Sequence, residues 1–479
     1  MEPISVKEIL QAVNGELLTG NENIVIKGAT TNSRQINKDD LFVPIIGERV
    51  DGHKFIAQAL NDGASVSFTS EHTKENVSQL TDKEDKAVIL VDDTLKALQD
   101  IATYSRSRFD IPLVGITGSV GKTTTKEMIA AALESAKCVL KTQGNLNSQI
   151  GVSLMMLRFE KKHEAAVIEM GVSEIGEMSR LVNIAKPGFA VMTNIGMSHI
   201  NQFKVKENTR KEKLNIINCM EPSFGTLFVN GDDELLAQII EYKKGNARID
   251  ISDDTKKILD KIKVVSLGTS KECDYYARDI NMIDEKSTFT MVHGDEIVPV
   301  TLNVAGKHNI INALAALAVS KQMGISYEDA VKGLRNYRPI AMRGTIISNG
   351  KFRIIDDTYN ASPDSIKSGI DVLTGMSDVT RTYAVLADVL ELGEVSYQCH
   401  YDVGKYVAQS KTDELVTIGN EAKAIAKAVN DANCGKVVHS FDSNEEAIAY
   451  LKENVCDNAL LLVKGSRGMH TDEIVEALK

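Results

Sequence analysis

The chain has 479 residues, of which 43% are hydrophobic and 25% charged, and its net charge is −11 at pH 7. This composition excludes a disordered chain, a collagen-like repeat and a coiled-coil rod, and no stretch reaches the roughly 20 apolar residues that a membrane helix needs. An acidic chain without a basic block is a poor candidate for binding nucleic acid, so we expect no nucleic-acid partner.

The beginning of the chain and its cysteines favour a cytoplasmic protein. The segment MEPISVKEILQAV has no basic stretch that leads into an apolar run, as a signal peptide would. The cysteines are scattered without a CxxC pair, which favours reduced thiols over disulfides or a zinc site. At roughly 150 residues per domain, the length predicts about three domains.

The first hundred residues alternate helical and strand-like patterns. Helical spacing of apolar residues covers 5–13 and 95–109, and 51–64 is typical of a helix that ends at Gly63. Apolar runs of strand length cover 40–46 and 64–70. These patterns predict a small α/β domain over residues 1–108, which ends before Pro112.

The next section, 109–338, opens with an apolar strand, a Gly-rich loop and a helix. Apolar strands recur at AAVIEM and FAVMTNIG with helical patterns between them, which predicts a mostly parallel sheet with helices on both faces. The alternation in TFTMVHGDEIVPVTLNV predicts antiparallel strands, and GKHNIINALAALAVSKQMG predicts a long buried helix.

A third section, 339–479, contains four apolar strand candidates separated by helical stretches. They are FRIIDDTYN, TYAVLAD, ELVTIGN and ALLLVKG. They predict a second open α/β sheet. The expected fold class is therefore α/β.

The loop GITGSVGKTT between the first central strand and its helix carries the clearest chemical signal. Backbone N–H groups of such a loop surround phosphates, Lys122 would pair with them, and the Thr123 hydroxyl would bind Mg²⁺. The strict pattern requires Gly where Ile116 stands, so the loop is a variant, and a surface turn is the alternative. The predicted nucleotide-binding residues are Gly118, Ser119, Val120, Gly121, Lys122, Thr123 and Thr124.

Two further residues follow strands of the same predicted sheet. Glu169 ends one strand and His199 follows the next, and carboxyl ends of parallel strands meet at one edge, so both should lie near Thr123. A carboxylate suits Mg²⁺, whereas His is a less usual ligand. A salt-bridged Glu and a His that caps backbone are the alternatives. Spacing alone makes Lys213 an exposed helix lysine.

Polar residues in the last two sections suggest nucleotide contacts. Asn309 and Asn312 share a helix face, where their amides could read an adenine edge, or Asn309 could cap the helix. Asp357 could bind ribose hydroxyls or cap the next helix. Lys464 and Arg467 follow the last strand, as ligand-binding cations or as solvated charges.

The ordered motifs resemble the Mur ligase family over nearly the whole chain. They include GITGSVGKTTT, GNLNSQIG, VIEMG, TNIGMSH, GKHNIINALAA, MRG, DDTYNASP and LVKGSRGM. DDTYNASP, and VLELG followed by His400, resemble the member that joins D-alanyl-D-alanine to UDP-N-acetylmuramoyl-tripeptide. The chain departs from the family pattern at Asn32, where Asp is usual, at Ser148, and in the segments after Gly171 and His199.

The resemblance implies three domains: a UDP-sugar-binding domain at 1–108, an ATP-binding P-loop domain at 109–338, and a Rossmann-like domain at 339–479 that binds the incoming dipeptide. It implies ATP and Mg²⁺ as cofactors and UDP-N-acetylmuramoyl-tripeptide and D-alanyl-D-alanine as substrates. The expected reaction is ATP-driven amide formation through an acyl phosphate. We expect a monomer.

The resemblance also implies roles for single residues. Lys122 and Thr123 would contact phosphate and Mg²⁺, Glu169 and His199 would be Mg²⁺ ligands, and Lys213 would be carbamylated to hold a second Mg²⁺. Asn309, Asn312, Arg343 and Asp357 would contact ATP. The expected substrate-binding residues are Ser33, Arg34, Asn145, Asn147, Tyr359, Asn360, Lys464 and Arg467.

Three alternatives stay open at the level of sequence. The first is a ligase that adds a different amino acid, including a folylpolyglutamate synthase-like enzyme that uses no UDP-sugar. The second is a P-loop switch or motor ATPase that binds a protein partner. The third is a weakly active paralogue that serves as a scaffold. The sequence does not say whether the tripeptide ends in lysine or in another diamino acid.

Overall fold

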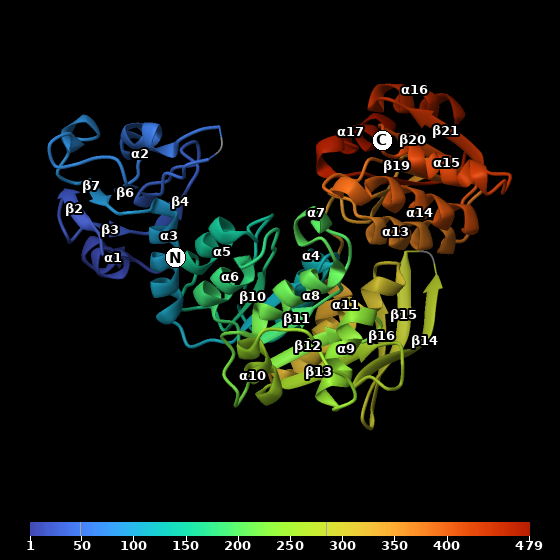
Figure 1. The fold of residues 1–479 in the computed structure, drawn as a ribbon, viewed down its shortest axis with the longest axis horizontal. Helices are drawn as coiled ribbons and strands as arrows, with labels where there is room; N and C mark the ends of the chain where they lie inside the picture. The colour runs from blue at the N-terminus through green and yellow to red at the C-terminus, as the bar shows by residue number, and fades with distance from the viewer. Residues whose placement is uncertain (48, 284) are drawn as a thin grey trace.

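Within residues 1–47, 49–283 and 285–479, which the computed structural model describes, three larger β-sheets form from successive stretches of the chain. Each sheet, with the helices that cover it, is one lobe. Figure 1 shows the N-terminal lobe and the C-terminal lobe on either side of the central lobe. The expected α/β fold class is confirmed. None of the described helices is both long and apolar enough to cross a membrane.

The N-terminal lobe has the strand order β2-β7-β6-β5-β4, in which only β2 is antiparallel to its neighbour. The expected helices are present, but the run 40–46 forms only a short strand, because Pro44 has no N–H to extend the ladder. The elements are β1 Ile4–Ser5, α1 Val6–Val13, β2 Glu16–Thr19, β3 Val25–Ile26, β4 Gly28–Thr30, β5 Asp40–Phe42, η1 Gly52–Phe55, α2 Ile56–Asp62, β6 Val66–Thr69, η2 Val77–Gln79, β7 Ala87–Leu90 and α3 Thr94–Ser107.

The central lobe has the strand order β16-β15-β14-β13-β12-β11-β8-β10-β9, parallel from β9 to β14 and antiparallel at β15 and β16, as expected. Strand β8 lies between β10 and β11, so its carboxyl end is the switch point where ligands bind in such sheets. The elements to β12 are β8 Leu113–Thr117, α4 Lys122–Leu133, β9 Val139–Lys141, α5 Gln149–Leu157, β10 Ala165–Glu169, α6 Glu177–Ala185, β11 Phe189–Met192, α7 Ile200–Phe203, α8 Lys206–Leu214, η3 Asn215–Ile217 and β12 Thr226–Asn230.

After β12 the chain adds β13 to β16 at one edge of the sheet, and it then forms two helices, α11 and α12, that pack on α4. Helix α11 packs on α4, which follows the Gly-rich loop. The remaining elements are α9 Glu234–Lys243, α10 Asp253–Lys261, β13 Lys263–Gly268, β14 Tyr275–Ile283, β15 Lys286–His293, β16 Glu296–Leu302, α11 Lys307–Gln322 and α12 Tyr327–Asn336.

The C-terminal lobe has the strand order β17-β18-β22-β19-β20-β21, and only β17 is antiparallel. The four expected strands are confirmed. The elements are β17 Thr345–Ser348, β18 Arg353–Asp356, α13 Pro363–Gly375, β19 Thr382–Ala387, η4 Gly393–Val395, α14 Ser396–Gln409, β20 Glu414–Ile418, α15 Lys423–Asp431, β21 Val437–Phe441, α16 Asn444–Asn454, β22 Leu460–Lys464, η5 Arg467–Met469 and α17 Asp472–Leu478.

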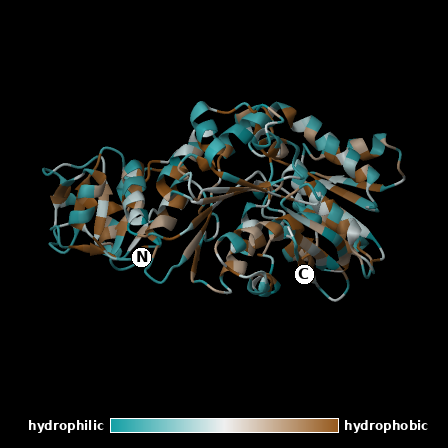
Figure 2. Cartoon of the chain, turned by 90° about the horizontal axis from the view of Figure 1, so that it is seen from below, coloured by the Kyte–Doolittle hydropathy of each residue, from teal (hydrophilic) through white to brown (hydrophobic). Residues whose placement is uncertain are grey.

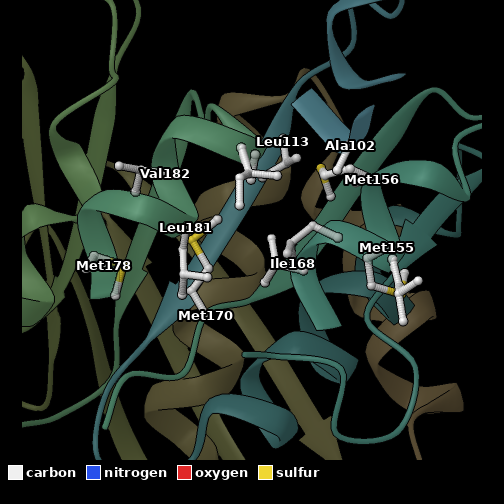
Figure 3. Close-up of a cluster of buried hydrophobic side chains, with 14 of the residues drawn as sticks. Ala102, Leu113, Met155, Met156, Ile168, Met170, Met178, Leu181 and Val182 are labelled. Atoms are coloured by element: carbon white, nitrogen blue, oxygen red, sulfur yellow. The ribbon is translucent and has the colours of Figure 1, made fainter. Parts of the chain in front are cut away.

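A buried apolar cluster fixes the strands that carry the site. Figure 3 shows Leu113 of β8 and Ile168 of β10 close to Met156 of α5 and Leu181 of α6, and all four side chains are buried. Burying one such side chain stabilises the fold by about 1.5–3 kcal/mol. Figure 2 shows hydrophobic colour on the inner strands and hydrophilic colour on the outer loops. Packing against α5 and α6 therefore fixes strands β8 and β10, whose carboxyl ends carry the site.

The predicted domain boundaries stay predictions. The boundary at 108/109 follows the end of α3 at Ser107, and the boundary at 338/339 lies between α12 and β17. Helix α3 also packs against α5 and α6, so the N-terminal lobe joins the apolar cluster of the central lobe.

Candidate active site

The Gly-rich loop connects the carboxyl end of β8 to the first turn of α4. Gly121 is the N-cap residue of α4 with φ +85°, and Gly118 has φ +149°. A Cβ atom at Gly118 would lie 1.9 Å from Thr193 Oγ1, so the close approach of the two loops requires Gly there. The Lys122 ammonium group folds back and donates to the carbonyl oxygens of Gly118 (2.9 Å) and Ser119 (3.3 Å).

The segment that follows β11 is joined to this loop by hydrogen bonds. The side-chain amide of Asn194 accepts from Val120 N–H at 2.8 Å and donates to Val120 C=O at 3.2 Å. The backbone carbonyl oxygen of Asn194 accepts from Ser119 N–H at 3.0 Å. The N–H groups of Ser119 and Val120 therefore have protein acceptors. The amides of Lys122, Thr123 and Thr124 in the first turn of α4 lack intrahelical acceptors and are available as donors to an anion.

Glu169 is the last residue of β10 and is 3% exposed. Its carboxylate accepts from the Thr123 hydroxyl at 2.9 Å and from Asn147 Nδ2 at 2.8 Å, and its backbone N–H donates to Thr142 Oγ1 at 2.8 Å. Among the described residues it forms no ion pair, so the salt-bridge alternative is wrong. A buried carboxylate with a hydroxyl beside it and no cationic side chain in contact has the donor chemistry of a Mg²⁺ site.

His199 precedes α7 with φ +56°, and its Nδ1 lies 2.9 Å from Glu391 Oε2 of the C-terminal lobe. Burial lowers the pKa of the imidazole, nearby Lys213 and Lys122 lower it further, and Glu391 opposes them. The imidazole is therefore biased toward its neutral form, in which one ring nitrogen has a free lone pair.

Lys213 lies on α8 and is 2% exposed, so the expectation of an exposed helix lysine, drawn from spacing alone, is wrong. Burial holds the pKa of its amine well below the usual lysine value, Lys122 lowers it further, and Glu212 and Glu177 oppose this. In the described part of the chain its amine has no hydrogen-bond or ion-pair partner. Such an amine is neutral over a wider pH range than an exposed lysine.

The two Asn residues of α11 line the same pocket but do not cap the helix. The N-cap residue is Gly306, so the capping alternative for Asn309 is wrong. Asn309 Nδ2 donates to the carbonyl oxygen of Ala305 at 2.7 Å, and Asn312 Oδ1 accepts from the Thr125 hydroxyl at 2.9 Å. Asn312 thus links α11 to α4, the helix that follows the Gly-rich loop, which is called the phosphate loop below.

The C-terminal lobe contributes an ion pair between buried Lys464 and partly exposed Asp357. Lys464 is 2% exposed and donates to Asp357 Oδ2 at 2.5 Å and to the carbonyl oxygen of Asn360 at 3.0 Å. Lys464 is therefore not a solvated charge, and since Ser362 is the N-cap residue of α13, Asp357 is not a helix cap. The pair holds the segment between β18 and α13 against β22.

The neighbouring cations of this lobe differ in position. The guanidinium carbon of Arg343 lies 3.9 Å from the ring centroid of Tyr359, a cation–π contact at the pocket wall. Arg467 lies in η5, half exposed, with Nη1 at 3.4 Å from Asp472 Oδ2.

One cavity of about 940 Å³ lies between the central and C-terminal lobes. It is lined by these predicted residues: Ser119, Val120, Gly121, Lys122, Thr123, Thr124, Asn145, Asn147, Glu169, His199, Asn309, Asn312, Arg343, Asp357, Tyr359, Asn360 and Lys464. Gly118, Lys213 and Arg467 do not line it. Ser33 and Arg34 follow β4 in the N-terminal lobe and are also outside it; there Arg34 N–H donates to Asn32 Oδ1 at 3.0 Å.

A second cluster of possible metal ligands lies in the N-terminal lobe. Asp51, His53 and Glu71 form the one group of three or more such side chains found in range of a common ion among the described residues. His53 is buried, and both of its ring nitrogens are hydrogen-bonded, Nδ1 to Asp51 (2.7 Å) and Nε2 to Ser70 N–H (3.1 Å). Burial and hydrogen bonding of His53 therefore account for this cluster without a metal ion.

Comparisons with known proteins agree with the motif pattern. The model of the Mur ligase middle domain matches residues 116–320, the Mur ligase glutamate ligase domain matches 342–467, and the Mur ligase family catalytic domain matches 25–106. The chain is 36% identical over 479 residues to a UDP-N-acetylmuramoyl-tripeptide–D-alanyl-D-alanine ligase of Bacillus subtilis, which covers 99% of this chain and 98% of the relative. This chain belongs to the Mur ligase family.

Solved structures of Mur ligases have the same architecture. A crystal structure of MurF from Acinetobacter baumannii superimposes with a TM-score of 0.86 at 29% identity and covers 100% of this chain and 99% of that one. The MurF ligase of Thermotoga maritima in complex with ADP gives a TM-score of 0.79 at 25% identity, covering 94% and 96%. The likeness thus extends over all three lobes.

Several residues that line this Mur ligase pocket or contact its lining were missed by sequence reasoning. Asn194 holds the phosphate loop, Glu391 contacts His199, and Asp364 accepts from Met197 N–H at 3.2 Å. Asn194 and Glu391 lie within the motifs TNIGMSH and VLELG, and Asn194 lies two residues after the end of β11. The rule that strand ends carry ligand contacts could have found Asn194; Asp364 and Glu391 depend on how the lobes meet.

Proposed function

We propose that this protein is the ATP-dependent ligase that joins D-alanyl-D-alanine to UDP-N-acetylmuramoyl-tripeptide in the synthesis of peptidoglycan precursors. Full-length likeness to ligases named for this reaction supports the proposal. The observation that carries it is the shared cavity, in which the phosphate loop and Glu169 of the central lobe face Asp357, Asn360 and Lys464 of the C-terminal lobe.

The chemistry requires a cavity of this kind. A carboxylate does not react with an amine at neutral pH because oxide is too poor a leaving group. A carboxylate oxygen of the tripeptide attacks the γ-phosphorus of ATP, ADP leaves, and an acyl phosphate forms. The amine of D-alanyl-D-alanine then attacks the acyl carbon, loses a proton, and phosphate departs with that carboxylate oxygen. Enclosure between two lobes keeps water from the acyl phosphate.

Lys122 and the start of α4 offset the charge of the reacting groups. The ATP γ-phosphate and the acceptor carboxylate are both anions, so bringing them together requires positive charge and N–H donors fixed in place. Lys122 is the first residue of α4, and its amine donates to the loop that precedes this helix. Burial is the main cause that lowers the pKa of Lys122, and Arg343 is close enough to lower it further. Both side chains line the cavity that the reacting groups would share.

We propose Thr123, Glu169 and His199 as the residues that hold Mg²⁺. The fit rests on a buried carboxylate that has no cationic partner within the described residues, a hydroxyl 2.9 Å from it, and an imidazole in the wall of the same cavity. The bound ion supplies charge neutralisation for the γ-phosphate and the developing transition state.

We propose that Lys213 is carbamylated and that its new carboxylate serves a second Mg²⁺. Carbamylation joins the neutral amine to CO₂ with loss of one proton, so it requires an unprotonated lysine. The amine of Lys213 is buried, has no partner among the residues that the structure describes, and has a lowered pKa, so it meets that requirement. The reaction replaces the neutral amine by an anionic carbamate, as a metal-binding role demands.

The remaining assignments concern substrates. Asn309, Asn312, Arg343 and Asp357 are proposed for ATP, and the UDP moiety is proposed to bind the N-terminal lobe near Ser33 and Arg34. The tripeptide and dipeptide ends are proposed to contact Asn145, Asn147, Tyr359, Asn360, Lys464 and Arg467.

We also propose the three predicted domains at 1–108, 109–338 and 339–479, and a monomer, in which the cavity is lined by residues of the central and C-terminal lobes of the same chain. A cytoplasmic location follows from dependence on ATP.

Phosphate release from ATP and Mg²⁺, measured with each substrate left out in turn, tests the proposal. Sustained release should require both UDP-N-acetylmuramoyl-tripeptide and D-alanyl-D-alanine, and the product should gain the mass of the dipeptide. Comparing tripeptides that end in lysine or in another diamino acid identifies the preferred third residue. Equal turnover of ATP with neither substrate would refute the ligase and favour a switch or motor ATPase.

A further inference from the structure

The segment from Gly196 to Asn201, here called the His199 loop, lies between the central and C-terminal lobes. Two carboxylates of the C-terminal lobe contact it: Asp364 Oδ2 accepts from Met197 N–H at 3.2 Å, and Glu391 Oε2 lies 2.9 Å from His199 Nδ1. These contacts come from different elements, α13 and the segment before η4. Two side chains of the C-terminal lobe, Asp364 and Glu391, therefore contact the His199 loop.

The packing of the two lobes at this loop is close. A Cβ atom added to Gly196 would lie 2.3 Å from Asp364 Oδ2, and one added to Gly393 would lie 2.5 Å from Asn201 Oδ1. Both glycines thus allow the C-terminal lobe to approach the His199 loop more closely than any other residue would.

The other side of the His199 loop is fixed to the phosphate loop. Gly196 N–H donates to Ser119 Oγ at 2.8 Å, and the Ser198 hydroxyl donates to the carbonyl oxygen of Ser119 at 3.3 Å. A continuous series of hydrogen bonds therefore runs from the C-terminal lobe through the His199 loop to the phosphate loop.

His199 and Glu391, which contact each other, both have an unusual backbone conformation. His199 has φ +56° and Glu391 has φ +65°, the left-handed region that residues other than Gly seldom occupy. Such conformations persist where the surroundings determine them, and they cluster at functional sites. Both residues are held so that their side chains meet across the lobe boundary.

We propose that Glu391 is a positioning residue that orients the His199 imidazole for the metal, so that the metal site is complete only when the C-terminal lobe is docked. A neutral imidazole has one N–H; if Nδ1–H donates to Glu391, the lone pair on Nε2 is left for a metal ion. Carboxylates that accept from metal-binding histidines in this way fix the ring and raise its basicity. The inference rests on the proposed role of His199 as a metal ligand.

The pairing is suited to a reversible contact. The Glu391 side chain is 67% exposed and that of His199 is 38% exposed, so solvent screens the pair and it is weak by itself. It forms because the lobes meet, and separation of the lobes frees the ring to rotate. Docking of the dipeptide-binding lobe is thereby coupled to assembly of the metal site.

Mn²⁺ binding to the full-length protein with saturating ADP, followed by electron paramagnetic resonance, tests this inference. Glu391→Ala should weaken Mn²⁺ binding by about 10-fold or more, the range typical for lost outer carboxylates. Glu391→Gln retains a carbonyl oxygen that accepts from Nδ1–H and should recover part of the affinity. Glu394→Gln, in exposed η4, should bind Mn²⁺ like the parent.

The outcomes separate this inference from the proposed function. If His199→Ala weakens Mn²⁺ binding and Glu391→Ala does not, Glu391 is merely a contact between lobes and the inference is overturned. If neither variant changes Mn²⁺ affinity, the inference falls together with the metal role of His199. Whether the parent protein is a ligase is decided separately, by substrate-dependent phosphate release. Thermal unfolding of each variant checks that its fold is intact.

Discussion

The amide side chain of Asn194 pairs with the peptide group of Val120, accepting from its N–H at 2.8 Å and donating to its C=O at 3.2 Å. The pair fixes the phosphate loop against the segment that follows β11. The loop is thus held in shape by a side chain from the neighbouring strand as well as by its own glycines.

Replacing Asn194 with Ala should weaken nucleotide binding. Two hydrogen bonds are lost, each with a net contribution of about 0.5–1.5 kcal/mol, so the dissociation constant for ADP should rise by roughly 5- to 150-fold. Asn194→Asp should be at least as damaging, because an anion would then face the Val120 carbonyl oxygen and the bound phosphates. Isothermal titration with ADP measures the effect.

The matched control for this prediction is Asn246→Ala, an exposed asparagine of the central lobe that bonds only to Glu241 in the described structure. It should bind ADP like the parent. If Asn194→Ala also bound ADP with unchanged affinity, the pairing with Val120 would have no part in shaping the loop.

Carbamylation of Lys213 should depend on pH in a defined direction. CO₂ reacts with the neutral amine, and protonation increases as pH falls, so both the carbamate and the ligase rate should decline toward acid pH. Because burial lowers the pKa of Lys213, the decline should occur at lower pH than for an ordinary lysine. Added bicarbonate should restore part of the rate on the acid side.

Labelled bicarbonate provides the direct measurement. With ¹³C-bicarbonate, the parent and Lys211→Ala should show a carbamate resonance that Lys213→Ala lacks. Lys211 is a suitable control because it lies on the same helix, half exposed, with Nζ at 3.4 Å from Asp250 Oδ1. Lys213→Ala should also lose at least about a hundredfold in rate. A rate in Lys213→Ala equal to that of Lys211→Ala would show that the amine is dispensable.

The buried amine should lower the stability of the uncarbamylated protein. Its folded-state pKa lies below the unfolded value, so the unfolded chain binds more protons and the free energy of unfolding rises with pH toward the ordinary lysine pKa. In CO₂-free buffer at pH 7, Lys213→Met should therefore melt at higher temperature than the parent, by roughly 1 °C per kcal/mol of penalty.

Calorimetry at two pH values tests the sign of this effect. The difference in Tm between Lys213→Met and the parent should shrink between pH 7 and pH 9.5. As the pH approaches the pKa of lysine in the unfolded chain, protonation of that lysine favours the unfolded state less. A difference that grows with pH would contradict the assigned direction.

The pair of Lys464 and Asp357 should matter more for ATP binding than for the chemical step. Lys464→Met leaves Asp357 and the carbonyl oxygen of Asn360 without their buried donor, and hydrogen bonds to charged groups contribute about 1.5–3 kcal/mol. We expect KM for ATP to rise by about tenfold or more with a smaller change in kcat. Lys452→Met, exposed on α16, is the control. A fall in kcat alone would place Lys464 in the chemistry instead.

The strand ends of the central lobe could be predicted from sequence. Apolar runs mark β8 and β10, and parallel strands bring their carboxyl ends together, so the contact between Thr123 and Glu169 follows from the pattern. The same reasoning applies to the loop before α4, whose glycines stand where the backbone requires positive φ.

Lys213 and the contacts between lobes could not be predicted in this way. Helix α8, KENTRKEKL, has the composition of a solvated helix, and Lys213 is buried because Glu212 accepts from the N–H groups of Gly176 and Met178 and draws α8 onto the start of α6. The partners Glu212 and Gly176 are 36 residues apart. Glu391 meets His199 only through the arrangement of two lobes, which no local pattern encodes.

Transfer of ¹⁸O tests the central claim, an acyl phosphate on the way to the amide, most directly. The tripeptide substrate is prepared with ¹⁸O in both oxygens of its terminal carboxylate and is turned over with ATP, Mg²⁺ and D-alanyl-D-alanine. The account predicts one ¹⁸O atom in each phosphate released and one in the new amide, read by mass spectrometry. Phosphate without ¹⁸O, formed at the same rate as product, would contradict it.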